Sequence, residues 1–325
     1  MKSFAHCNAA SVDNAIAIAG GSADPTCWMA GGTDLLGVLK DQLLPDYPAT
    51  VINLKTIPGL DRVEEDAGGV RLGALARLST LARHPELLQR FPALAAAAES
   101  VATPEIRNMA TLGGNLCQDN RCWYYRYAHH MGGRMLCKRK GSGPCHAVRG
   151  DNRYHVVIGG KGCFAPCPSD IAVALSALDA SLEIAGPGGG RTLPIHEFYT
   201  PLGHVLGPGE VLTGVRVPAP AVGSRQAFRK FTVRKPVDFA VVSVAAVVSV
   251  EGGLCRGARI VLGGVAPAPW RAEAAERAVV GQPLAADSVG QGADRVLEQA
   301  RPLSMNAYKV DIARSLVREV LGSLT

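Results

Sequence analysis

The chain has 325 residues, a length that predicts two or three domains with sizeable hydrophobic cores. Hydrophobic residues make up 47% of the chain and charged residues 19%, which excludes an intrinsically disordered protein. The net charge of +6 is modest, and the longest apolar stretches, such as 239–250, are too short to span a membrane.

The first predicted unit is a small α/β region over about residues 1–56. A helix at 13–19, a strand at 26–30, a helix at about 35–42 and a strand at 50–54 follow one another. The first strand ends in Gly31 and Gly32, and either Thr33 or Asp34 has the side chain of a helix N-cap. Free backbone N–H groups at such a point favour an anion.

A mixed region follows, over about 57–222. It is predicted to hold a strand at 70–74, helices at 78–91 and 92–101, and a second glycine turn at 110–116. A cysteine-rich segment, an apolar helix that opens at 168–170, and strands at 181–184 and 211–217 come next. The overall fold class is α+β.

The stretch from Pro218 to Gly223 is the best linker candidate, and it separates a smaller C-terminal region. Here two β-branched runs, 239–250 and 258–265, flank a hairpin turn at 251–253. Apolar residues at helical spacing predict that the chain ends in an amphipathic helix.

Nine cysteines are present, and six of them fall within 117–167. In a cytoplasmic chain such a cluster indicates metal or redox chemistry rather than disulfides. The spacing of Cys122, Cys137, Cys145 and Cys163 contains no closely spaced pair of the kind that structural zinc sites use. It favours an iron–sulfur cluster, and zinc and unliganded thiols remain alternatives. Nine Lys or Arg lie between 121 and 161 with one acid, Asp151, which would balance an anionic centre. Cys7, Cys27 and Cys255 are expected to be core residues.

Neither glycine turn matches a nucleotide-binding fingerprint, because the chain contains no G-x-G-x-x-G and no G-x-x-x-x-G-K-[ST]. A Rossmann domain for nicotinamide cofactors and a P-loop are therefore disfavoured. Two tight turns of this kind are common in any α/β protein. Together they can also cradle the two phosphates of one ligand.

Several motifs resemble, in family order, those of the FAD-binding medium subunits of the molybdenum hydroxylases (the xanthine dehydrogenase family). The first flavin loop of that family is similar to 30–36 here, and the second to 110–116. Further matching stretches are Pro168-Ser169-Asp170, Phe228-Arg229-Lys230, Asp238-Phe239-Ala240 and 262–267. The resemblance implies a vanillyl-alcohol-oxidase (PCMH)-type FAD-binding domain at 1–222, with subdomains at about 1–56 and 57–222. It also implies a smaller α+β domain of the CO dehydrogenase flavoprotein type at 223–325.

An insertion at about 117–164 resembles that of 4-hydroxybenzoyl-CoA reductase and periplasmic aldehyde oxidoreductase, in which it carries a [4Fe–4S] cluster. By this resemblance the ligands are Cys122, Cys137, Cys145 and Cys163. Cys117 is then a neighbour, and Cys167 stands where many relatives have His.

The resemblance also implies the residues that bind FAD. Those expected at the pyrophosphate are Ala30, Gly31, Gly32, Thr33, Asp34, Leu35, Thr111, Gly114 and Asn115. Asp170 matches a position near the ribose or adenine, or else only caps a helix. Lys230 matches a lysine near the isoalloxazine ring, or else is a surface strand lysine. Leu212 or Val211 packs on the ring, or else belongs to the core.

The implied function is electron transfer within a heterotrimer, between an external partner and a small [2Fe–2S] subunit that serves a large molybdopterin subunit. Ferredoxin or a quinone-linked protein is the expected external partner, and no residue here is expected to act on an organic substrate. The alternatives are a basic zinc module that binds nucleic acid and a stand-alone flavin oxidoreductase. Because the N-terminus does not resemble a secretory signal, we expect a cytoplasmic protein, periplasmic only if a partner subunit carries it.

Overall fold

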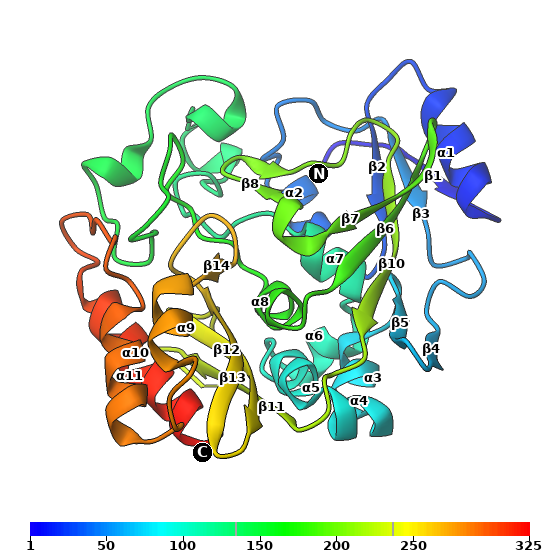
Figure 1. Cartoon of the computed structure of the whole chain (residues 1–325). Coiled ribbons are helices and arrows are strands. Elements are labelled where there is room, and N and C mark those ends of the chain that lie inside the picture. Colours follow the sequence, from blue (N-terminus) through cyan, green and yellow to red (C-terminus); the bar gives the residue numbers. More distant parts are fainter. Residues whose placement is uncertain (134, 236) are drawn as a thin grey trace.

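The computed structural model describes residues 1–133, 135–235 and 237–325 (Figure 1). The N-terminal unit is a parallel sheet of three strands, and its central strand is the last of the three in the chain. Parallel neighbours need crossover connections, which two helices supply. The elements are β1 (Ala5–Asn8), α1 (Val12–Gly20), β2 (Thr26–Met29), α2 (Leu35–Lys40) and β3 (Thr50–Asn53).

The second unit is an antiparallel sheet of five strands that is covered by short helices. Across the sheet the strands are β4 (Val63–Asp66), β5 (Gly69–Gly73), β10 (Val211–Pro218), β6 (Ser181–Gly186) and β7 (Gly189–Pro194). The helices are α3 (Leu78–Arg83), α4 (Pro85–Arg90), α5 (Pro92–Glu99), α6 (Pro104–Met109), α7 (Leu112–Cys117) and α8 (Asp170–Ala177). Their buried residues join those of β5, β6 and β10 in one hydrophobic core.

Two details of this unit differ from the sequence prediction. The single helix expected at 78–91 is two helices, because Pro85 begins α4 and the preceding residue, His84, is extended. The second glycine turn is the start of a helix, α7, in which Thr111 is the N-cap and its side chain accepts a hydrogen bond from Gly114 N at 3.2 Å.

The C-terminal domain is an antiparallel sheet with helices on one face. Its strands are β11 (Ser224–Phe231), β12 (Val242–Glu251), β13 (Leu254–Gly263) and β14 (Trp270–Arg271), and the predicted hairpin joins β12 to β13. Its helices are α9 (Glu273–Val279), α10 (Ala286–Arg295) and α11 (Tyr308–Gly322), the last of which is the predicted amphipathic helix. Helices α5 and α8 of the second unit also contact this sheet, so the domains share an extensive interface.

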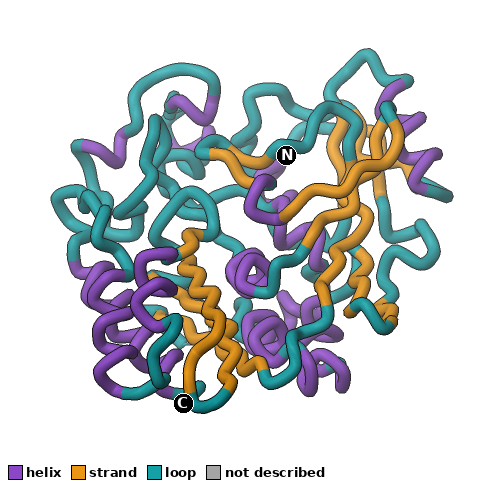
Figure 2. The backbone as a smooth tube through the Cα atoms, viewed as in Figure 1, coloured by secondary structure: helices purple, strands orange, loops and turns teal. Residues whose placement is uncertain are grey.

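The cysteine-rich insertion is almost entirely loop and lies beside the C-terminal domain (Figure 2). Its described part contains no strand and only the short 3₁₀ turns η1 (His129–Met131), η2 (Lys138–Lys140) and η3 (His146–Val148). Backbone hydrogen bonds attach it to the C-terminal domain, from Val157 N to Val265 O at 2.9 Å and from Arg301 N to Val157 O at 2.7 Å. The insertion is therefore built onto the C-terminal domain.

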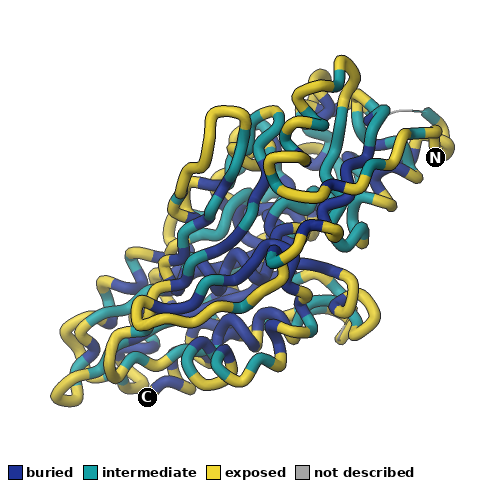
Figure 3. Tube along the Cα trace, turned by 90° about the vertical axis from the view of Figure 1, so that its right-hand side faces the viewer, coloured by how far each residue is buried: buried dark blue, intermediate teal, exposed yellow. Residues whose placement is uncertain are grey.

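Buried residues follow the middle of the molecule, and exposed ones follow its outer loops (Figure 3). Small elements complete the fold near the insertion: η4 (Ile195–Glu197), β8 (Tyr199–Thr200) and β9 (Gly203–His204). Among the described residues, no helix has the length and apolar character needed to cross a membrane.

Candidate functional site

The two glycine segments, far apart in the sequence, lie against each other. A Cβ atom added to Gly31 would be 2.0 Å from the carbonyl oxygen of Met109, the last residue of α6. Only glycine allows this close approach of backbone to backbone. The segment 30–35 and the start of α7 therefore form one continuous surface with their N–H groups at helix N-termini, which suits an anion.

Two cavities open from this surface. The first, of about 410 Å³, is lined by an apolar set that includes Trp28, Leu35, Val211 and Leu212. The second, of about 330 Å³, contains the charged pair Asp170 and Lys230. The residues that line both cavities are Thr33, Asp34, Gly114 and Gln118. A long ligand whose phosphates lie at these shared residues can extend one end into each cavity.

The charged pair in the second cavity is buried. Lys230 Nζ lies 2.9 Å from an Asp170 carboxylate oxygen, and it also donates a hydrogen bond to Ser100 O at 2.9 Å. The side chains of Lys230 and Asp170 are only 8% and 6% exposed, so Lys230 is not a surface lysine. The N-cap of α8 is Ser169, whose hydroxyl accepts from Ala172 N and donates to Asn115 Oδ1. Because Ser169 caps the helix, the Asp170 carboxylate is not needed as a cap, and it lines the cavity together with Lys230.

Leu212 and Lys230, both expected at the isoalloxazine ring, line different cavities. Asp170, expected toward the adenine end, shares the cavity of Lys230. The resemblance implied Leu212 and Lys230 at one end of the ligand and Asp170 at the other. The structure instead places Lys230 with Asp170, and Leu212 apart from both. Of the other predicted flavin residues, Thr33, Asp34 and Gly114 lie where the two cavities join. Asn115 lines the second cavity. The first cavity is lined by the rest, which are Ala30, Gly31, Gly32, Leu35 and Thr111.

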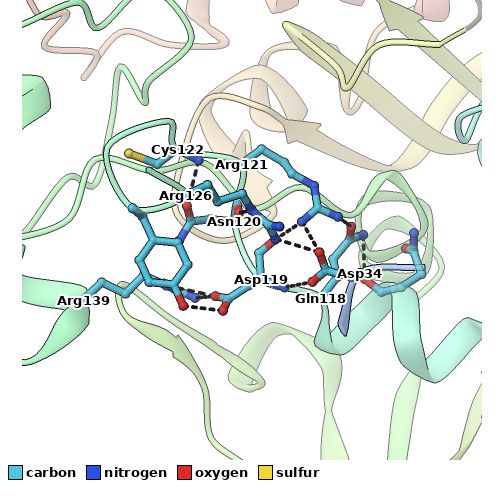
Figure 4. A network of polar contacts seen from close by, with 10 residues as sticks. Asp34, Gln118, Asp119, Asn120, Arg121, Cys122, Arg126 and Arg139 are labelled. Atoms are coloured by element: carbon cyan, nitrogen blue, oxygen red, sulfur yellow. Dashed lines mark hydrogen bonds and ion pairs between the residues drawn. The ribbon is translucent and has the colours of Figure 1, made fainter. Parts of the chain in front are cut away.

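The insertion forms part of this site through Asp34, whose side chain does not cap α2. Instead its carboxylate accepts hydrogen bonds from Arg121 Nη1 at 2.5 Å, from Arg126 Nη2 at 2.7 Å and from Asp119 N at 2.9 Å (Figure 4). The Arg121 guanidinium also lies over the ring of Phe239 at 4.6 Å. The sequence did not predict that Arg121 and Arg126 pair with Asp34, although both belong to the basic stretch at 121–161.

A second ion pair continues this network toward the cysteines. Arg139 Nη2 and Tyr125 Oη donate to the Asp119 carboxylate at 2.7 and 2.6 Å. Burial raises the pKa of Asp119, but the charge of Arg139 and these hydrogen bonds outweigh it and leave the pKa below its usual range. Arg126 and Arg139, expected to balance a cluster, thus also neutralise Asp34 and Asp119.

Each of the four expected cluster cysteines lies close enough to at least one other for the two thiols to interact electrostatically. The thiol of Cys122 interacts with those of Cys145 and Cys163, and Cys163 also interacts with Cys137. Burial raises the pKa of Cys122 to about 11. No group of three or more His, Cys, Asp or Glu within the described ranges is arranged to hold a single metal ion.

The other cysteines have different surroundings. Cys117 and Cys167 both interact with the partly buried Tyr199, and burial raises the pKa of each thiol to about 12. Cys255 is fully buried in the C-terminal core, as expected, whereas Cys7 and Cys27 are only partly buried.

Comparison with known families agrees with this geometry. Residues 2–220 match the model described as the FAD binding domain in molybdopterin dehydrogenase. Residues 226–324 match the CO dehydrogenase flavoprotein C-terminal domain. The chain belongs to this family, the FAD-binding medium subunits of the molybdenum hydroxylases, whose characterised members are oxidoreductase subunits.

Individual relatives span nearly the full length. The chain is 36% identical over 308 residues to the aldehyde oxidoreductase FAD-binding subunit PaoB of Escherichia coli, covering 91% of this chain and 90% of that one. It is 28% identical to the carbon monoxide dehydrogenase medium chain of Hydrogenophaga pseudoflava, covering 96% and 94%. A solved structure of carbon monoxide dehydrogenase from H. pseudoflava superposes with a TM-score of 0.78 at 27% identity, covering 99% and 97%.

Proposed function

We propose that the chain binds one FAD across both cavities and transfers electrons between an external partner and the other subunits of a molybdenum hydroxylase complex. The observation that carries this proposal is the junction of two cavities at a double helix N-terminus. An FAD has its pyrophosphate between two bulky ends, so it matches this shape. When bound, FAD supplies two-electron redox chemistry.

The isoalloxazine ring is assigned to the cavity of Lys230 and Asp170, and the adenine to the apolar cavity of Leu212. A cation beside the isoalloxazine stabilises the reduced anionic flavin and raises its reduction potential. Replacing Lys230 with Met should lower the flavin potential, whereas Leu212→Ala should weaken FAD binding with little effect on the potential. A lowered potential in Leu212→Ala and an unchanged one in Lys230→Met would reverse the assignment.

We further propose that Cys122, Cys137, Cys145 and Cys163 bind a [4Fe–4S] cluster. Such a cluster takes one thiolate on each of four irons, so its ligands need not converge on one point as those of a single ion do. The four thiols belong to one loop, and each interacts electrostatically with at least one of the others, which supports such a cluster. When bound, the cluster supplies one-electron transfer.

The cysteine assignment is tested by iron and acid-labile sulfide analysis of protein purified without oxygen. Cys122→Ser and Cys145→Ser should lose the cluster, while the matched controls Cys7→Ser and Cys255→Ser should retain it. Four irons per chain in Cys122→Ser would refute the ligand set, and zinc in place of iron would support the alternative of a zinc site.

The proposed partners are a small [2Fe–2S] subunit and a large molybdopterin subunit, with ferredoxin or a quinone-linked protein as the external partner. Two relatives are named medium chains of dehydrogenases, which supports a multi-subunit assembly. Purification of the tagged chain from its native host should recover both subunits. A chain that purifies alone and oxidises an aldehyde at full rate would instead be a stand-alone flavin oxidoreductase.

A further inference from the structure

His155 lies beside Cys122 inside the insertion. The distance from His155 Nε2 to Cys122 Sγ is 3.3 Å, which is within hydrogen-bonding range for sulfur. The residue is buried, with 2% of its surface exposed. The second ring nitrogen, Nδ1, is buried without a hydrogen-bond partner in the described part of the chain. Within the described part of the chain, the contact with sulfur is thus the only hydrogen bond of the imidazole ring.

Aromatic side chains fix the plane of this imidazole. The ring of Trp123 packs edge-on against it with centroids 5.7 Å apart, and the ring of Tyr124 lies at 6.0 Å. Trp123 in turn packs edge-on against Tyr154. Because the residues that follow Cys122 pack against His155 and its neighbour Tyr154, the imidazole has little freedom to turn away from the sulfur.

The C-terminal domain holds the backbone of His155. Its carbonyl oxygen accepts from Asn306 Nδ2 at 3.0 Å and from Lys309 Nζ at 3.1 Å, and both of these residues are fully buried. Its N–H donates to Asn152 O at 2.9 Å, and the side chain of Asn152 accepts from Met305 N. A buried lysine amine is costly unless it is hydrogen-bonded, so Lys309 depends on this carbonyl group. These contacts together fix the backbone of His155.

We propose that His155 donates an Nε2–H hydrogen bond to the Cys122 thiolate and thereby raises the reduction potential of the cluster. The inference rests on the proposed cluster site. A ligating thiolate carries no proton and can only accept, so the proton lies on Nε2 and Nδ1 is bare. Hydrogen bonds to cluster sulfurs stabilise the more negative, reduced state. His155 is a positioning residue, since it acts on the cluster only through Cys122.

The test is a redox titration of the cluster, followed by EPR, in protein purified without oxygen. His155→Phe keeps an aromatic ring but removes the donor, so its midpoint potential should shift to a more negative value. The matched control is His146→Phe in the same insertion, because His146 Nε2 contacts Leu136 O at 2.8 Å rather than sulfur. Its potential should stay at the wild-type value. His155→Gln, which restores an N–H donor, should move the potential back toward wild type.

Each other outcome has a definite meaning. Full iron content with a wild-type potential in His155→Phe overturns the donor role and leaves the cluster proposal standing. Loss of iron from both His155→Phe and His155→Gln also overturns it, because the residue would then be needed for assembly. If only His155→Phe loses iron, the comparison is between His155→Gln and wild type. A cluster potential in His155→Gln close to the wild-type value then supports the donor role, and a clearly more negative value refutes it. Wild-type protein without iron refutes the cluster itself.

Discussion

The ion pair of Lys230 and Asp170 is almost fully desolvated, which makes its two charges strongly interdependent. In FAD-free protein, Lys230→Met leaves Asp170 buried without its cation and should lower the free energy of unfolding by about 3–5 kcal/mol. The double variant Lys230→Met/Asp170→Leu should recover most of this loss, because it removes both charges. Urea unfolding measures both values, and a double variant no more stable than Lys230→Met would show that the pair is not coupled.

Gly114 contributes space as well as an N–H group. A Cβ at this position would be 2.9 Å from the Thr111 hydroxyl that caps α7. Gly114→Val should therefore weaken FAD binding at least tenfold, about 1.4 kcal/mol. Gly20→Ala is the control, since no atom lies within 4 Å of its added Cβ. Flavin content is measured by absorbance of the folded protein, and an unchanged content in Gly114→Val would contradict the role of this loop.

Glu210 gives the site a pH-dependent support. The hydrogen bond from Arg191, then that from Gly207 N, lowers the pKa of its carboxyl from 4.5 to about 2. Its stabilising effect is therefore complete above pH 4.5 and disappears as the pH falls toward 2. Because both side chains are partly exposed, the effect should be below about 1 kcal/mol. Thermal unfolding of Glu210→Gln should show a smaller loss between pH 5 and 3 than wild type, and an equal loss would contradict this.

Residue types alone predicted the glycine segments and the cysteine group, because their chemistry is local. They did not predict the partners of Asp34, which come from Arg121 and Arg126, roughly ninety positions along the chain. A local pattern suggested a helix cap at Asp34, and tertiary pairing overrode it. The cavity of Asp170 likewise depends on Lys230 of β11, and the pairing of these two side chains was not predicted from the sequence.

At the scale of elements, the insertion depends on α11 and the loop before it. Asn306 Nδ2 donates to His155 O and to Val156 O, both at 3.0 Å. Asn306→Ala leaves the buried Val156 carbonyl unpaired and should cost about 1–3 kcal/mol, whereas His155 O keeps its hydrogen bond from Lys309. Amide hydrogen exchange should accelerate over 152–158, while the exposed control Gln291→Ala should leave it unchanged. Unaltered exchange in Asn306→Ala would show that the contact does not hold the insertion.

Helices and strands were predictable where the apolar pattern was long, as in β10, β12, β13 and α11. Short elements were predicted only in part, since β2, β3 and β5 were expected but β1, β4 and β7 were not. Helices α9 and α10 are separated by only a few residues and were missed, and α7 resembled a turn because of its two glycines. The insertion has almost no regular structure, so hydrophobic periodicity contains no information about its course.

At the scale of the whole molecule, the proposed flavin site belongs to both domains. The glycine segments come from the first, whereas Lys230 and Phe239 come from the C-terminal domain. The insertion closes one wall and is itself attached to the C-terminal domain. The proposed FAD and cluster sites are therefore linked through Asp34, Asp119 and Arg139, which places both redox groups in one connected structure.

The most direct test of the proposed function is a reductive titration of the purified chain with dithionite in the absence of oxygen. An FAD accepts two electrons and a [4Fe–4S] cluster accepts one, so about three reducing equivalents per chain are expected. Bleaching of the flavin absorbance should accompany the EPR signal of a reduced cluster. Uptake of only two equivalents, with no such signal in protein that retains its FAD, would contradict the account.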